Sequence, residues 1–166
     1  MRYDDASWHY NGDYPAGSPK EFGGTHIALF LKWCFRQGWA GHRHLQKAPK
    51  ETRAVIDGLM TASDFFFRFC GGKLTNKDLS PEGNAFAGQY YGNDGLYTLD
   101  FSTAFTGLVY RAPEEAHDFT TLDGFIKERR LSGVLTFSRS VSWNHKEREK
   151  LTRPKRRIGR AIPAIR

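Results

Sequence analysis

The six histidines are the first residues that could do chemistry, because imidazole binds transition metals and titrates near neutral pH. His42 and His44 lie two residues apart in a polar stretch, and His9 and His26 stand in separate aromatic segments. Zinc sites use three or four His, Cys or carboxylate ligands at recognisable spacing, and neither HExxH nor a paired CxxC occurs. We therefore predict surface or capping histidines, with no metal ligand and no cofactor.

The carboxylates offer acid–base chemistry if the fold gathers them. The simpler interpretation places Asp78 and Glu82 at a helix start and leaves Asp4 and Asp5 to cap the N-terminus at the surface. We therefore predict no catalytic residue. A hydrolase stays open as an alternative, and it would require a deep pocket joining His9 or His26 to two carboxylates. Asp100 is a further carboxylate that could take part in such a site.

Cys34 and Cys70 stand far apart in apolar contexts. A secreted disulfide scaffold would carry more cysteines at closer spacing, so we predict two buried free thiols. No G-x-S-x-G elbow or phosphate-binding glycine loop accompanies them. The sequence gives no support to nucleophilic catalysis.

A protein-binding surface is the function that the remaining polar and aromatic residues favour. Trp8 either packs against the helix that begins near Thr25 or contacts a partner, since Trp and Tyr are enriched in binding hot spots. The predicted partner-binding residues are Asp4, Asp5, Trp8, His9, Asp78 and Glu82.

The net charge of +7 is concentrated at the C-terminus. Residues 136–166 hold 10 basic and 2 acidic residues, which leaves 15 basic and 16 acidic residues in 1–135. A basic run attracts phosphates without sequence preference, so non-specific nucleic-acid binding is an alternative function for this tail. Its candidate residues are Lys146, Arg148, Lys150, Arg153, Lys155, Arg156, Arg157 and Arg160.

The elements that must position these residues are mainly helical. An apolar helix is predicted from Thr25, as N-cap, to about Gly38, and a second from Pro49 or Thr52 to about Cys70. Between them, residues 40–51 are predicted to form a polar connection.

Farther along the chain, Ser80 as N-cap and Pro81 at the first helical position predict another helix, with Phe86 and Tyr90 one turn apart. Residues 97–108 fit either a helix or a strand, and helix is preferred. A short helix starts at Pro113 or Thr121, and residues 134–143 alternate like a strand.

Four segments resemble a known family: YDDASWH, GGTHIALFLKWCFRQGW, GGKLTNKDLSPEGNAFAGQYY and YTLDF. They are similar to a family of small uncharacterised bacterial cytosolic proteins, classed as a domain of unknown function, over about residues 3–105. The resemblance implies, by analogy, an immunity-type or secretion-accessory protein. The pattern fades beyond residue 106, so the tail is either a basic arm or a frameshifted terminus.

Together these features predict a mainly α fold, with α+β as the alternative: a compact helical domain with an N-terminal extended strap and a minor β element. We expect one globular domain over 1–135 and a basic tail over 136–166. Without a signal peptide or an apolar run of about 20 residues, a cytoplasmic protein is expected. The expected partner is a protein, a toxin or a secretion-system component, with no membrane partner.

Overall fold

The computed structural model describes residues 1–10, 14–92, 95–105 and 116–135. Within them it has seven α-helices, two short 3₁₀-helices and one two-stranded sheet, which confirms the mainly α prediction. The helices are α1 (Thr25–Arg36), α2 (His42–Lys47), α3 (Pro49–Asp57), α4 (Ala62–Cys70), α5 (Pro81–Tyr90), α6 (Leu96–Ala104) and α7 (Ala116–Leu131). The predicted strand at 134–143 and the basic tail lie almost wholly outside the described residues.

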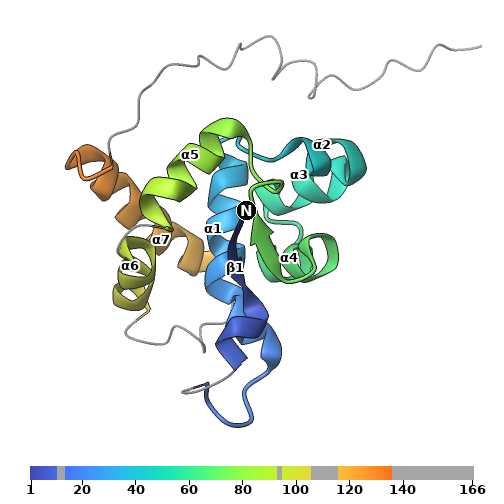
Figure 1. The fold of residues 1–166 in the computed structure, drawn as a ribbon, viewed down its shortest axis with the longest axis horizontal. Helices are drawn as coiled ribbons and strands as arrows, with labels where there is room; N and C mark the ends of the chain where they lie inside the picture. The colour runs from blue at the N-terminus through green and yellow to red at the C-terminus, as the bar shows by residue number, and fades with distance from the viewer. Residues whose placement is uncertain (11–13, 93–94, 106–115, 136–166) are drawn as a thin grey trace, which may run out of the picture.

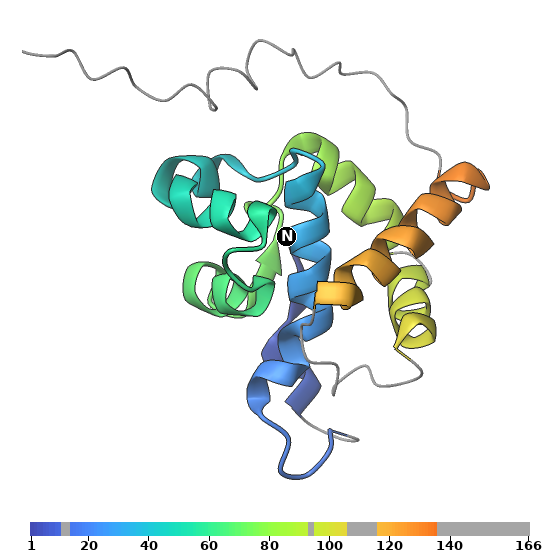
Figure 2. The same ribbon diagram turned by 180° about the vertical axis from the view of Figure 1, so that it is seen from behind.

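Helix α1 forms the centre of the fold (Figure 1). Helices α2, α3 and α4 lie on one side of it and α5, α6 and α7 on the other, an arrangement seen again from behind in Figure 2. Ten of its twelve residues are buried, as expected for a helix that is apolar on nearly all faces. Thr25 is not the N-cap that we predicted: Gly24 takes that position, and Thr25 is a buried helical residue.

The single helix predicted up to Cys70 is wrong, because the chain breaks it in two. Gly58 has a left-handed backbone (φ 76°) and ends α3, and Thr61 then caps α4 by accepting a hydrogen bond from the Asp64 N–H. Apolar residues at helical spacing, Leu59 among them, continue across this break in the sequence. Leu59 nevertheless lies between α3 and α4 and is 84% exposed. The predicted polar connection before α3 also contains the extra helix α2.

The helix predicted to start at Ser80 and Pro81 is confirmed as α5. The Ser80 hydroxyl accepts a hydrogen bond from the Gly83 N–H, and Pro81 begins α5. The Phe86 and Tyr90 rings lie 5.5 Å apart, and residues 97–104 are helical.

The N-terminal strap is extended as predicted, but it forms a strand inside the fold. Strand β1 (Arg2–Asp5) pairs antiparallel with β2 (Lys73–Thr75), with Asp4 opposite Leu74 and Asp5 opposite Lys73. Residues Ala6–Tyr10 form the 3₁₀-helix η1, and Lys20–Gly24 form η2, just before α1. The strap therefore brings residues 4–9 against the start of α1.

Helices α6 and α7 are held to the core by polar contacts of buried groups. The Trp33 Nε1–H on α1 donates to Asp123 Oδ1 on α7 at 2.9 Å. Asp100 on α6 is 2% exposed and accepts from Arg129 on α7 at 2.7, 3.1 and 3.2 Å and from the Tyr90 hydroxyl at 2.7 Å. A buried carboxylate with these donors fixes α7 against α6.

Candidate functional site

The Asp4 cluster consists of Asp4, His9, His26 and Tyr91. His9 Nε2 lies 2.9 Å from Asp4 Oδ1, and His26 Nε2 lies 3.4 Å from Asp4 Oδ2. The Tyr91 hydroxyl donates to Asp4 Oδ2, and the Asp5 N–H donates to Asp4 Oδ1 at 2.7 Å. The two imidazole rings meet edge to face, with centroids 4.6 Å apart. One carboxylate therefore lies between two imidazoles.

Four separate elements assemble this cluster. Asp4 comes from β1, His9 from η1, His26 from the first turn of α1, and Tyr91 follows α5. Burial raises the pKa of Asp4, but hydrogen bonds with His26, His9 and Tyr91 outweigh it and hold that pKa well below its usual range. Burial lowers the pKa of His26, so a neutral His26 imidazole faces an ionised Asp4.

The Asp78 cluster consists of Arg43, His44, Cys70, Thr75 and Asp78. Asp78 is fully buried, and its Oδ1 lies 2.8 Å from His44 Nε2 and 3.4 Å from Arg43 Nη1. Its Oδ2 accepts from the Thr75 N–H and hydroxyl, both at 2.7 Å. These contacts tie α2 to the β2–α5 connection.

The close approach of α2 to the β2–α5 connection explains why residue 41 is a glycine. A Cβ on Gly41 would lie 2.4 Å from the Lys77 carbonyl oxygen, and the Gly41 N–H donates to the Asp78 carbonyl at 2.9 Å. A larger residue there would push α2, and with it His44, away from Asp78.

A Cys–His–Asp set suggests a nucleophilic triad, but this geometry is not one. Cys70 Sγ (3.8 Å) and Asp78 Oδ1 (2.8 Å) both face the same nitrogen, His44 Nε2, whereas a triad uses the two ring nitrogens for base and orienter. Burial raises the pKa of the Cys70 thiol far above its usual range. The thiol is therefore protonated, and we interpret the cluster as a structural one.

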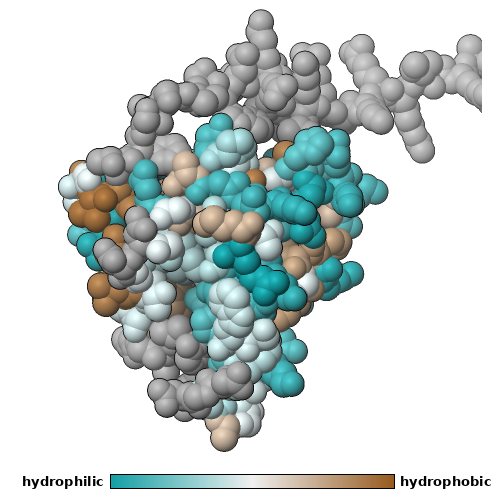
Figure 3. All heavy atoms as spheres, viewed as in Figure 1, coloured by the Kyte–Doolittle hydropathy of each residue, from teal (hydrophilic) through white to brown (hydrophobic). Residues whose placement is uncertain are grey.

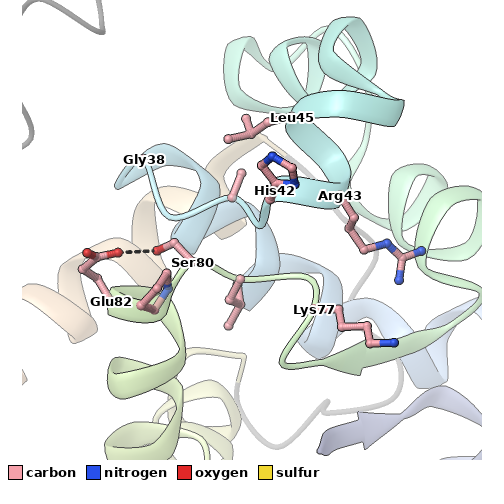
Figure 4. A pocket seen from close by; sticks show the side chains of 10 residues that line it. Gly38, His42, Arg43, Leu45, Lys77, Ser80 and Glu82 are labelled. Carbon is pink, nitrogen blue, oxygen red and sulfur yellow. Dashed lines mark hydrogen bonds between the residues drawn. The ribbon is translucent and has the colours of Figure 1, made fainter.

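The α2–α5 groove is a surface pocket of about 560 Å³ between α2, the residues before it and the start of α5. Figure 4 shows Arg43 and Lys77 on one side of it and Glu82, hydrogen-bonded to Ser80, on the other. Its lining residues are Gly38, Ala40, His42, Arg43, Leu45, Lys77, Leu79, Ser80, Pro81 and Glu82. Apolar side chains thus form part of a wall that also carries cationic groups.

The surface of the domain is uneven in polarity. Hydrophilic residues dominate the side that α2, α3 and β2 occupy in Figure 3, and apolar residues gather near α6 and the end of α7. Leu99 and Leu131 are 58% and 89% exposed there.

The predicted acidic surface is wrong, because burial removes most of it. Asp4 and Asp5 are 7% and 4% exposed and Asp78 is 0% exposed, so these three carboxylates are internal. Asp5 caps the start of η1 by accepting from the Ser7 N–H at 3.0 Å. Asp78 does not serve the start of α5, since its oxygens face Thr75, His44 and Arg43.

The other predicted partner-binding residues stay accessible. Trp8 is 55% exposed, and the Arg2 guanidinium lies 5.8 Å from its ring centroid, which does not favour the interpretation that Trp8 packs against α1. His9 is half-buried in the Asp4 cluster, and Glu82 lines the groove. The nucleic-acid candidates of the tail, Lys146 to Arg160, lie outside the described residues.

The histidine prediction fails at the two buried positions. His26 and His44 are each 2% exposed and pair with carboxylates, so they are neither surface nor capping groups. No short spacing signals these pairs, because His44 and Asp78 are 34 residues apart. Both cysteines are buried and free, as predicted.

The hydrolase alternative required two carboxylates around His9 or His26. Both imidazoles face the same carboxylate, Asp4, and neither histidine lines the α2–α5 groove. The geometry does not support that alternative.

A comparison with protein families matches residues 2–116 to a domain of unknown function, DUF7832. The chain belongs to this family. The residues of the Asp4 cluster, the Asp78 cluster and the groove all lie within the matched segment of this chain. Searches of curated proteins and of solved structures found no match. Among the described residues of this DUF7832 chain, no helix has the length and apolarity needed to cross a membrane.

Proposed function

We propose that this DUF7832 protein is a non-catalytic protein-binding domain, and that its α2–α5 groove receives an acidic segment of a partner protein. The partner class is a bacterial toxin, which the domain would neutralise, or a secretion-system component. The observation that carries the proposal is the groove itself, whose partly apolar wall carries Arg43 and Lys77 on one side and Glu82 on the other.

Charge complementarity identifies the kind of segment that fits. Arg43 is already neutralised in part by buried Asp78, but Lys77 is exposed and forms no ion pair with any residue that the structure describes. A partner carboxylate beside Lys77 would supply the missing counter-charge. Glu82, on the opposite wall, would repel the same carboxylate and so fix the orientation of the segment.

The groove would bind one apolar side chain of the partner and would form only part of the interface. Leu45 is 39% exposed at its edge, and Ala40, Leu79 and Pro81 extend the apolar wall. An apolar side chain of the partner that enters beside Leu45 would bury this surface, while charges at the rim guide association.

The test uses purified products of the genes adjacent to the gene for this chain. We expect one of them to bind the full chain directly, and deletion of the gene to sensitise cells to that product if it is a toxin. If none binds and deletion changes no sensitivity, the proposal is refuted.

A second function has its own observation, the concentration of 10 basic against 2 acidic residues in 136–166. We propose that this tail binds nucleic acid non-specifically. Filter binding over a salt titration should show steep salt dependence for the full chain and a much weaker interaction for residues 1–135. Equal, weak binding by both would remove this function.

A further inference from the structure

We propose that Asp4, His9 and His26 form a binding site for a divalent first-row transition-metal ion. One ligand atom from each residue can be chosen so that all three lie within 4.8 Å of one another. This site is distinct from the groove and does not depend on the proposed partner.

Two of the separations between donor atoms are as short as those between ligands of one small metal ion. Ligand bonds of about 2.0–2.2 Å place two ligands of a tetrahedral ion about 3.3–3.6 Å apart, and those of an octahedral ion about 2.8–3.1 Å apart. The observed separations are 2.9 Å from Asp4 Oδ1 to His9 Nε2 and 3.4 Å from Asp4 Oδ2 to His26 Nε2. Small side-chain adjustments would let an ion replace these direct contacts.

The donors also have suitable chemistry. Two imidazoles and one carboxylate bind zinc, iron and related ions, and open positions remain for water. Burial lowers the pKa of His26, and the pKa of Asp4 is lowered although burial alone would raise it, so both shifts favour the metal-binding forms, the neutral imidazole and the ionised carboxylate.

The surroundings of Asp4 are those expected of a metal-binding carboxylate. The Tyr91 hydroxyl and the Asp5 N–H hold its two oxygens. Burial raises the pKa of Tyr91, so its phenol remains a hydrogen-bond donor to Asp4. The side chain of His9 is 21% exposed, against 3% for His26, and it marks the side from which an ion enters.

The Asp78 cluster has three comparable donor groups but fits a cation poorly. The Arg43 guanidinium lies 3.4 Å from Asp78 Oδ1 and already provides a positive charge. In contrast, no Arg or Lys among the described residues lies within ion-pair distance of Asp4, whose basic neighbours are the imidazoles of His9 and His26. The Asp4 cluster is therefore the better cation site.

The experiment is a Co²⁺ titration of the metal-stripped full chain, followed by visible absorption and by the metal content of the dialysed protein. We expect one Co²⁺ per chain, displaced by Zn²⁺. Tyr91→Phe should weaken binding by about 10–100-fold, the usual effect of losing an outer hydrogen bond, and His9→Ala should weaken it more. His42→Ala, a matched change at an exposed histidine, and Cys70→Ala should bind as the wild type does.

Circular dichroism of each variant establishes that it is folded, and His9 is partly exposed, so its replacement leaves the core intact. The proposal is overturned if the wild type binds no Co²⁺. It is equally overturned if His9→Ala binds as tightly as the wild type, or if binding is lost in His42→Ala or Cys70→Ala instead.

Discussion

Replacing Asp78 by Ala tests whether the Asp78 cluster stabilises the fold. Asp78 is 0% exposed and accepts from His44 at 2.8 Å and from two Thr75 donors at 2.7 Å. Each buried donor left without an acceptor costs about 1–3 kcal/mol, and removing one partner of a buried charge pair costs about 3–5 kcal/mol. Thr75 is only half-buried, so its N–H and hydroxyl can bind water when Asp78 is removed. The costs of the separate hydrogen bonds therefore do not simply add. We expect the free energy of unfolding to fall by about 3–5 kcal/mol.

The assay is urea unfolding at neutral pH, followed by tryptophan fluorescence and circular dichroism. Asp57→Ala is the control, because Asp57 forms an exposed ion pair with Arg53 one helical turn away, worth about 0.3–0.5 kcal/mol. Asp78→Asn keeps the shape of the side chain, so its loss of unfolding free energy should lie between those of Asp57→Ala and Asp78→Ala. A loss of less than about 1 kcal/mol for Asp78→Ala would show that these buried hydrogen bonds do not stabilise the fold.

Three further predictions follow from buried polar groups. Burial raises the pKa of Asp78, but hydrogen bonds from His44 and Thr75 outweigh burial and lower that pKa overall. The stability that ionised Asp78 contributes is therefore complete above the unfolded-state pKa of about 3.9 and is lost as the pH falls through the folded-state pKa. Acid titration of Asp78→Asn should therefore show a shallower loss of stability below about pH 4 than the wild type. Arg129→Ala should lower the free energy of unfolding in urea by about 1.5–3 kcal/mol, because it leaves buried Asp100 with Tyr90 as its main donor. A loss below about 0.5 kcal/mol would contradict this. Cys34 and Cys70 should react with a thiol reagent only in urea, since burial raises both pKa values, and rapid native reaction would show that they are accessible.

The sequence predicted those parts of the fold that depend on neighbouring residues. Ser80 and Pro81 start α5 because a cap and a fixed φ act within one turn. The predicted helix to Cys70 failed at Gly58, because an apolar stripe has the same spacing in one helix and in two helices separated by a short turn.

The buried polar groups could not be predicted, because they depend on contacts far apart in the chain. Asp4 is buried because β1 pairs with a strand about 70 residues later, and no local pattern indicates that pairing. His44 likewise meets Asp78 only after α2 folds back on the β2–α5 connection. Short-range spacing is the usual signal of a metal or acid–base site, and both clusters lack it.

The binding affinity of the adjacent-gene product for wild-type, Lys77→Glu and Lys50→Glu proteins tests the proposed function most directly. Lys50 is a matched control, exposed on α3 and outside the groove lining. If the partner binds in the groove, Lys77→Glu should weaken binding by about tenfold at low salt, mainly through slower association, and Lys50→Glu should leave it unchanged. Equal affinities for the two variants would show that the partner does not bind in the α2–α5 groove.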